Sequence, residues 1–275
     1  MAIEWTSSQK QRLRELGGTP DVIKRFETSE ERDEAFAVEV AHHQAANRKE
    51  IRYVQKRPER DRLAHLEEVL AHALISNGFL EVRTPTIISS RALSKMGIDD
   101  SHPLHHQVFW LDEGRCLRPM LAPNLYFLMR HLKRTAKMPL RMFEIGTCYR
   151  KESRGSDHLE EFTMLNLVEM APEGDPMTCL RAHIDLIMRT VGLDYELCTT
   201  DSEVYGDTLD VEVNGIEVAS AACGPHRLDG AHGITDAWVG AGYGLERLLM
   251  VKTGASNIKK VGRSLMYLRG ARLDI

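Results

Sequence analysis

The 275-residue chain is 43% hydrophobic and 28% charged, which is ordinary for a soluble globular protein of one large domain, or of one domain with a helical appendage. Its five cysteines form no Cys-X-X-Cys pair, which argues against a zinc site and for reduced thiols in a cytoplasm. The N-terminus has no apolar leader, and no apolar run reaches the ~18 residues of a membrane span. We therefore expect a cytoplasmic protein with no membrane partner.

The formal net charge of −4 disfavours a nucleic-acid partner, but basic residues gather in three segments, 47–62, 114–143 and 247–273. The first contains seven basic residues against three acidic ones, and the other two each contain seven basic residues and no acidic one. Any one of these segments is most simply a solvated helix face. Together they predict local patches that attract polyphosphate while the remaining surface stays acidic.

Residues 1–57 are expected to form a small helical prefix. The pattern predicts a short helix over Ser7–Leu16, ended by two glycines, and a longer one over 30–52 with Ser29 as its N-cap. A proline then separates the prefix from the main domain, which is expected to occupy residues 58–275.

The main domain is expected to begin with a long amphipathic helix over 61–77 and a strand over 79–85 that a proline ends. The apolar stripe of that helix consists of Leu63, Leu66, Leu70 and Leu74. A hairpin over 108–118 and a helix from 122 to about 135 should follow, with a proline near the start of the helix, where its missing N–H costs little.

The second half of the chain is expected to contain most of the sheet. A long hairpin over 143–170 precedes a helix over 175–191, and two strands over 208–213 and 216–222 flank an Asn-Gly turn. The segment 240–249 runs from a glycine-rich strand into a helix. Strands joined mainly by hairpins predict an antiparallel sheet flanked by helices, so the fold class is α+β and not doubly wound α/β.

Three segments occur in the order of motifs 1, 2 and 3 of the class II aminoacyl-tRNA synthetases, which the chain resembles: 78–85, 150–162 and 240–247. Within that class, the runs Leu-Arg-Pro-Met-Leu-Ala-Pro-Asn-Leu-Tyr, Tyr-Arg-Lys-Glu-Ser and His-Leu-Glu-Glu-Phe-Thr-Met-Leu-Asn look like the pyrrolysyl-tRNA synthetase family. The resemblance covers about residues 60–275. The short prefix suggests the compact form of that family, without the separate N-terminal tRNA-binding domain of some members.

The resemblance implies an ATP-dependent ligase that converts pyrrolysine into an aminoacyl-adenylate and transfers it to the 3′-terminal ribose of tRNA(Pyl). Attack on the α-phosphate concentrates negative charge, so this chemistry needs positioned cations, and the planar guanidinium of arginine suits phosphate. By resemblance, Arg150 contacts the α-phosphate and Arg247 the γ-phosphate of a bent ATP. Glu152 is implied to orient the adenine amino group, and these three residues are the expected catalytic set.

Further ATP contacts are implied at the same cleft. Phe162 is expected to stack on adenine, under a loop that carries His158 and Leu159. Glu217 and Ser220 resemble the Mg²⁺ ligands of the family, and hard oxygen donors are what Mg²⁺ requires. In a regular strand these two positions face opposite sides, so joint ligation would need a bulge or an intervening water.

Met164, Asn166 and Val168 share one strand face, which should extend the ATP cleft into an amino-acid pocket. By resemblance, its other walls are Leu121, Ala122, Leu125, Tyr126, Met129, Tyr205, Ala222, Cys223 and Trp238. No carboxylate is available there for the ammonium group of free lysine, and an unpaired buried charge is prohibitive. The pocket therefore suits the uncharged amide and apolar ring of pyrrolysine, with related lysine derivatives as further candidates. Many family members have Cys in place of Val168 and Phe in place of Tyr243, so the breadth of specificity stays open.

No segment is a candidate anticodon-binding domain, so the tRNA is expected to be recognised by its acceptor stem and compact body. Lys56, Arg57 and Arg60 are the predicted tRNA contacts. The helix over 61–77 and the strand that follows it resemble the class II dimer element, and an open patch of this kind would expose Leu and Val, so we also expect a homodimer.

Two other hypotheses compete with this one. Another class II synthetase, such as a phenylalanyl-type enzyme, is disfavoured by Asn166 and by the small Ala122 and Ala222. A non-catalytic paralogue that binds tRNA or a partner would usually lose a motif 2 or motif 3 arginine, whereas this chain retains Arg150 and Arg247. ATP–pyrophosphate exchange with pyrrolysine and with the standard amino acids separates the three.

Overall fold

The computed structural model describes residues 3–20, 24–151, 158–202 and 204–275. The strands of its main sheet are β1 (Leu80–Glu81), β5 (Leu140–Tyr149), β6 (Glu161–Met170), β7 (Glu196–Ser202), β8 (Gly206–Val213), β9 (Ile216–Gly224) and β10 (Trp238–Gly244). They lie in the order β1-β5-β6-β10-β9-β8-β7. All neighbours are antiparallel except β1 and β5, which are parallel. The expected α+β class is confirmed, with one parallel pair at an edge.

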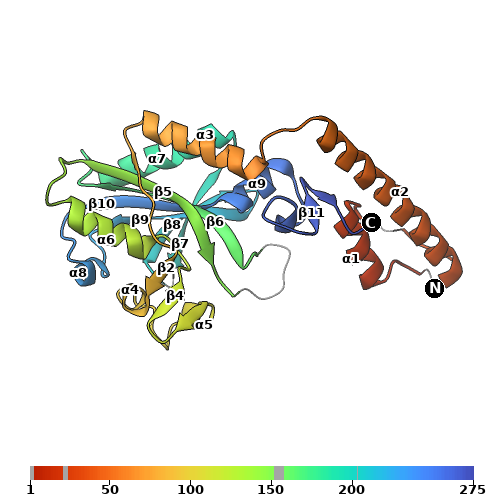
Figure 1. Ribbon diagram of the computed structural model, residues 1–275, viewed down its shortest axis with the longest axis horizontal. Coiled ribbons are helices and arrows are strands. Elements are labelled where there is room, and N and C mark those ends of the chain that lie inside the picture. Colours follow the sequence, from red (N-terminus) through yellow and green to blue (C-terminus); the bar gives the residue numbers. More distant parts are fainter. Residues whose placement is uncertain (1–2, 21–23, 152–157, 203) are drawn as a thin grey trace.

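Helices cover both faces of this sheet and form a separate lobe (Figure 1). Their bounds are α1 (Ser7–Leu16), α2 (Ser29–Lys56), α3 (Arg62–Ser76), α4 (Ser90–Ser94), α5 (Pro103–His106), α6 (Ala122–Leu132), α7 (Pro176–Val191), α8 (Asp229–His232), α9 (Leu245–Thr253) and the 3₁₀ turn Ile258–Lys260. Two small sheets consist of β2 (Ile87–Ser89), β3 (Trp110–Asp112) and β4 (Arg115–Leu117), and of β11 (Tyr267–Leu268) and β12 (Ala271–Arg272).

Several predicted boundaries were wrong by a few residues. Helix α2 begins one residue early because Thr28, and not Ser29, is its N-cap and accepts a hydrogen bond from the Glu31 N–H. The helix continues to Lys56 because nothing in its sequence stops it before the proline at 58. The strand predicted over 79–85 is reduced to β1, and β7 was not predicted.

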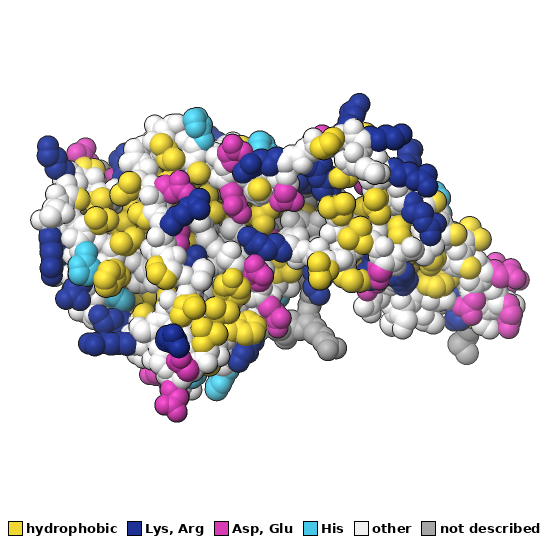
Figure 2. All heavy atoms as spheres, viewed as in Figure 1, with side chains coloured by type: hydrophobic (Ala, Val, Ile, Leu, Met, Phe, Trp, Pro, Cys, Tyr) yellow, Lys and Arg dark blue, Asp and Glu magenta, His cyan; other side chains and the backbone are white. Residues whose placement is uncertain are grey.

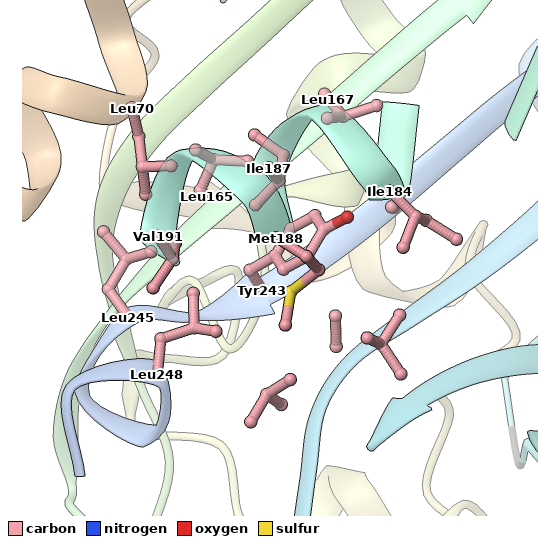
Figure 3. Close-up of a cluster of buried hydrophobic side chains, with 14 of the residues drawn as sticks. Leu70, Leu165, Leu167, Ile184, Ile187, Met188, Val191, Tyr243, Leu245 and Leu248 are labelled. Atoms are coloured by element: carbon pink, nitrogen blue, oxygen red, sulfur yellow. The ribbon is translucent and has the colours of Figure 1, made fainter. Parts of the chain in front are cut away.

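The larger hydrophobic core lies between α3, α7 and α9 and one face of the sheet. Figure 3 shows its side chains directed toward one another, with labels on Leu70, Leu165, Leu167, Ile184, Ile187, Met188, Val191, Tyr243, Leu245 and Leu248. The predicted leucine stripe of α3 is buried here. Because this face of the sheet is filled, any open site must lie on the opposite face, under α6.

Tyr243 is fully buried in this core, and within the described chain its hydroxyl has no hydrogen-bond partner. A stranded polar group of this kind costs about 1 to 3 kcal/mol. We therefore expect Tyr243→Phe to raise the free energy of unfolding by about 1 kcal/mol or more. Urea titration checks this, and an unchanged or lower midpoint would contradict it.

The α1–α2 lobe has a small core of its own around Trp5, Leu13 and Phe26. It is joined to the last strands of the chain through Asn47, whose amide donates to the Leu16 carbonyl and accepts from the Arg272 N–H. In Figure 1 the lobe therefore lies beside the C-terminus. None of the helices in the described ranges combines the length and the apolar character that crossing a bilayer requires.

Candidate active site

A cavity of about 520 Å³ opens on the sheet face opposite the main core. Its floor consists of β6, β9 and β10, and α6 forms one wall. Gly240, Gly242 and Gly244 alternate along β10 and all line it. A Cβ at position 242 would come within 3.1 Å of the Asn166 amide, so glycine there keeps the floor open.

Most residues predicted for the amino-acid pocket lie together in one half of this cavity: Ala122, Leu125, Tyr126, Met129, Met164, Asn166, Val168, Tyr205, Ala222 and Trp238. Leu121 and Cys223 are absent from its lining, so their predicted places were wrong. The side chain of Leu121 is completely buried at the start of α6. Cys223 follows Ala222 on β9 and so faces the opposite side of the sheet, where it packs against the main core.

Asn166 lies in the cavity floor on β6, opposite Gly242 of β10. Its Oδ1 is buried and has no hydrogen-bond partner among the described residues. A buried polar atom without a partner is costly, which marks this acceptor as a position where a bound molecule would supply the donor. It is the one side-chain amide of the predicted set at this end of the cavity.

The other half of the cavity contains the predicted phosphate and adenine contacts. Arg150 follows β5, and its Nε donates to the Pro119 carbonyl at 2.9 Å while its guanidinium lies 5.4 Å from the centre of the Phe162 ring. Arg247 lies in the first turn of α9, and one of its amino groups donates to the Glu217 carbonyl at 3.2 Å. His158, Leu159 and Phe162 also line the cavity. Glu152 lies outside the described residues.

Glu217 and Ser220 both line the cavity, and a bulge, one of the two ways expected to allow their joint use, lies between them. The β8–β9 register shifts so that Val211 pairs with Ala219 but Glu212 pairs with Glu217. The extra residue turns Glu217 to the same face as Ser220. Burial raises the pKa of Glu217, and the nearby guanidinium groups of Arg247 and Arg150 offset only part of that rise.

Sequence reasoning missed a second carboxylate in this half of the cavity. Asp210 pairs with Ser220 across β8 and β9 and lines the same space. Hydroxyl groups of Thr200 and Thr208 donate to it at 2.6 and 3.3 Å. The three oxygen donors Asp210, Glu217 and Ser220 therefore fit a hard cation such as Mg²⁺.

The site is supported by the buried carboxylate Glu246 and by the buried ion pair Arg118–Glu144. The sequence indicated neither. Glu246, adjacent to Arg247, accepts the Thr163 N–H with both oxygens at 2.9 Å and so joins α9 to the strand that carries Phe162. Burial raises its pKa. Arg118 donates to Glu144 at 2.7 Å next to Pro119, whose carbonyl accepts from Arg150, and both side chains are about 2–3% exposed.

The basic segments are less available than their sequence suggests. Within 114–143, Arg118 is buried against Glu144, Lys133 pairs with Asp236, and Arg141 pairs with Glu169. Within 247–273 the side chains with internal partners are Arg247, Lys252, Lys260, Arg263, Arg269 and Arg272. These side chains therefore have internal partners that a sequence count does not reveal, and a phosphate-binding role of the two segments stays a prediction.

The segment 47–62 differs from the other two. Figure 2 shows Lys and Arg side chains along the outer edge of the α2 lobe, and Lys56, Arg57 and Arg60 are all exposed. Arg57 stacks on the Tyr53 ring and donates to its hydroxyl, and Arg60 pairs with Glu68 at 3.1 Å. Exposed pairs of this type contribute little, so these cations remain available to a larger anion.

Glu169, Cys179 and His183 bring three possible metal ligands within 4.8 Å of one another, on the face of the sheet away from the cavity. Glu169 is already satisfied, since His183 contacts it at 2.5 Å and Arg141 donates to it at 3.0 Å. Burial tends to raise the pKa of Glu169, but these hydrogen bonds outweigh it and leave the pKa below its usual value. We interpret the cluster as a structural ion pair.

Comparison with known proteins is consistent with this geometry. The model of the tRNA synthetase class II core domain matches residues 48–269. A crystal structure of pyrrolysyl-tRNA synthetase from Desulfitobacterium hafniense is 46% identical over all of both chains, with a TM-score of 0.91. A second structure of the enzyme from that organism gives 46% identity and a TM-score of 0.89, over 99% of this chain and 96% of the other.

Curated relatives match over a shorter stretch. A threonine–tRNA ligase of Wolbachia pipientis subsp. Culex pipiens (strain wPip) is 29% identical over 150 residues, which are 50% of this chain and 22% of that protein. The chain thus spans about a fifth of the length of this relative.

Proposed function

The chain belongs to the class II tRNA synthetase family and, within it, to the pyrrolysyl-tRNA synthetases, and on this premise we propose that it activates pyrrolysine with ATP and ligates it to tRNA(Pyl). The observation that carries the proposal is one continuous cavity with two arginines at one end and a neutral, aromatic-walled space at the other. Charging of tRNA(Pyl) with pyrrolysine by the purified protein tests it. Charging with a standard amino acid instead would refute it.

In the first step, the carboxylate of pyrrolysine attacks the α-phosphorus of ATP, and the bond to pyrophosphate breaks. We assign Arg150 to the α-phosphate and Arg247 to the γ-phosphate, with adenine on Phe162. The contact between Arg150 and the Pro119 carbonyl orients its guanidinium before ATP arrives, so little reorganisation is needed when charge develops. In the second step, the terminal ribose hydroxyl of the tRNA attacks the adenylate carbonyl and AMP leaves.

Asp210, Glu217 and Ser220 would hold Mg²⁺ in this proposal. The ion supplies positive charge that neutralises the phosphates. Arg247 also contacts Glu217, and its guanidinium lies 3.9 Å from the Glu217 carboxylate. The arginine assigned to the γ-phosphate is therefore next to one of the proposed Mg²⁺ ligands.

The pocket half of the cavity accounts for the choice of pyrrolysine. A neutral amide donor on the substrate would satisfy the unpartnered Oδ1 of Asn166. The ring at the end of the substrate would lie among Tyr126, Tyr205 and Trp238, which form apolar walls. Related lysine derivatives with an uncharged amide and an apolar end group are further candidate substrates.

Asn166→Ala is expected to raise the barrier for activating pyrrolysine by about 1 to 3 kcal/mol, because the substrate amide loses its acceptor. The wider pocket should also admit aromatic amino acids. ATP–pyrophosphate exchange measures both effects. An unchanged kcat/KM for pyrrolysine would mean that Asn166 does not face the substrate.

We propose that the exposed basic side of the α2 lobe binds the tRNA body, through Lys56, Arg57 and Arg60. Contacts to phosphates release counterions, so tRNA affinity should fall steeply with salt concentration. Amino-acid activation does not involve this surface and should change far less.

Charge reversal at Lys56 or Arg57 is therefore expected to raise the KM for tRNA and to leave ATP–pyrophosphate exchange unchanged. The matched control is Arg189→Glu, since Arg189 is an exposed arginine on α7, on the far side of the sheet from the cavity. Normal charging by the Lys56 and Arg57 variants, or an equal loss in the control, would refute this tRNA surface.

We also propose that two copies form a homodimer through the α3–β1 region. β1 is an edge strand of the main sheet. Ile75 and Leu80 are each 52% exposed beside it, and Ile87 is 48% exposed. A second copy would cover these apolar side chains.

We also propose that the protein works in the cytoplasm. All five cysteines are free thiols, as expected in a reducing compartment.

A further inference from the structure

Asp229 is a buried carboxylate that neither the sequence pattern nor the proposed chemistry accounts for. It begins α8, behind the pocket half of the cavity, and is 4% exposed. A carboxylate buried to this extent is costly unless several donors satisfy it. The donors that satisfy Asp229 come from three different parts of the chain.

Two of these donors are walls of the pocket. The Tyr126 hydroxyl on α6 donates to Oδ1 at 3.0 Å, and the Trp238 indole N–H on β10 donates to the two oxygens at 3.1 and 3.0 Å. The third donor is the His226 N–H, at 2.6 Å from Oδ2. Asp229 thus joins the helix on one side of the pocket to the strand that forms its floor.

The third aromatic wall is connected to the same carboxylate through His226. The His226 ring lies 2.5 Å from the Tyr205 carbonyl, and the two rings are 5.3 Å apart. Tyr126 is also stacked on His232 at the end of α8, with 4.2 Å between ring centres. Short helix α8 therefore supports Tyr126 and Trp238 from behind, and His226, just before the helix, supports Tyr205.

The Trp238 ring lies so close to Gly224 that any side chain at that position would overlap it. The indole is consequently confined between Gly224 and the Asp229 carboxylate. Because the Tyr126 hydroxyl is directed at Asp229, the pocket receives the face of an apolar ring and not a polar group. The carboxylate itself is not part of the cavity lining, so it is shielded from a substrate ammonium group by Tyr126 and Trp238.

We propose that Asp229 is a positioning residue that fixes Tyr126, Trp238 and, through His226, Tyr205, and thereby sets the shape of the pocket that receives the distal ring of the amino-acid substrate. This inference rests on the proposed function for the identity of that substrate. The arrangement of the pocket walls does not depend on the proposed function and can be measured in the free protein.

The test uses Asp229→Asn, which keeps the size of the side chain and removes its charge. Losing hydrogen bonds to a charged group at two walls should raise the KM for pyrrolysine in ATP–pyrophosphate exchange by about tenfold or more. The KM for ATP should not change, because the phosphate half of the cavity does not contact Asp229. Asp236→Asn is the matched control, since Asp236 is a half-buried carboxylate between α8 and β10 that pairs with Lys133 and not with a pocket wall.

Tyr126→Phe is a second variant that removes one hydrogen bond and retains the carboxylate, so it serves if Asp229→Asn does not fold. Tyr126→Phe should also raise the KM for pyrrolysine. In the double variant this KM should rise by less than the product of the two separate fold-changes. Equal increases in the KM for ATP and pyrrolysine, or a normal KM for pyrrolysine in both variants, would overturn the proposal.

Tryptophan fluorescence of the free protein gives an independent readout. Asp229→Asn should shift the emission, because Trp238 loses its hydrogen-bond partner, and Asp236→Asn should not. If the unmodified protein fails to activate pyrrolysine, the proposed function is wrong, and fluorescence alone then tests the positioning role of Asp229. A shift in Asp229→Asn then supports the positioning role, and identical spectra overturn it.

Discussion

Replacing either Arg150 or Arg247 with alanine is expected to slow adenylate formation by about a hundredfold or more, the scale seen when one preorganised charge stabiliser is removed. The two arginines enter the cavity from different elements, one after β5 and one in α9. Both lie near Glu217, where burial raises the pKa of the carboxylate and the charges of the two arginines offset part of that rise. They are thus placed to act on a single polyphosphate.

ATP–pyrophosphate exchange measures the effect, with circular dichroism as the check that each variant folds. Arg150→Lys is an informative partner variant because it retains the charge but loses the planar fork, so its rate should lie between those of the wild type and Arg150→Ala. Near-normal exchange in a folded alanine variant would show that the phosphates bind elsewhere.

Disrupting the Arg118–Glu144 pair should have the largest effect on stability. Glu144 accepts from Arg118 at 2.7 Å and from the Thr84 hydroxyl at 2.7 Å, while Arg118 also donates to the Thr147 carbonyl at 2.8 Å. Removing one member of a buried pair leaves an uncompensated charge, and the expected loss for Glu144→Ala is about 3 to 5 kcal/mol in the free energy of unfolding.

Urea unfolding of a short series tests this. The double change Arg118→Met with Glu144→Leu should cost much less than Glu144→Ala, because no buried charge is left without a partner. If the single variant unfolds at the wild-type urea concentration, or if the double variant is the less stable of the two, the pair does not support the site as we describe.

The sequence could predict those parts of the site in which one short run of residues determines where the side chains lie. Met164, Asn166 and Val168 line the cavity because alternation along one strand places them on one face. The arginines followed from resemblance to a family with the same motif spacing. A bulge was one of the two ways in which Glu217 and Ser220 could act together, and the register of β8 and β9 shows one.

The residues that were missed depend on which strands and helices become neighbours. Asp210 is adjacent to Ser220 only through the β8–β9 pairing, and Asp229 meets Tyr126 across 103 positions of sequence. Charge counting along the chain misses the same kind of information. It cannot distinguish a solvated arginine such as Arg57 from Arg118, which is buried against a carboxylate.

The central claim is that the cavity activates pyrrolysine. ATP–pyrophosphate exchange with the purified protein tests it most directly, with pyrrolysine, free lysine and each of the other standard amino acids supplied in turn. We expect exchange that depends on pyrrolysine and is absent with lysine, whose ammonium group would meet no accessible carboxylate. Exchange driven by lysine, phenylalanine or threonine and not by pyrrolysine, or no exchange with any of them, would contradict the account.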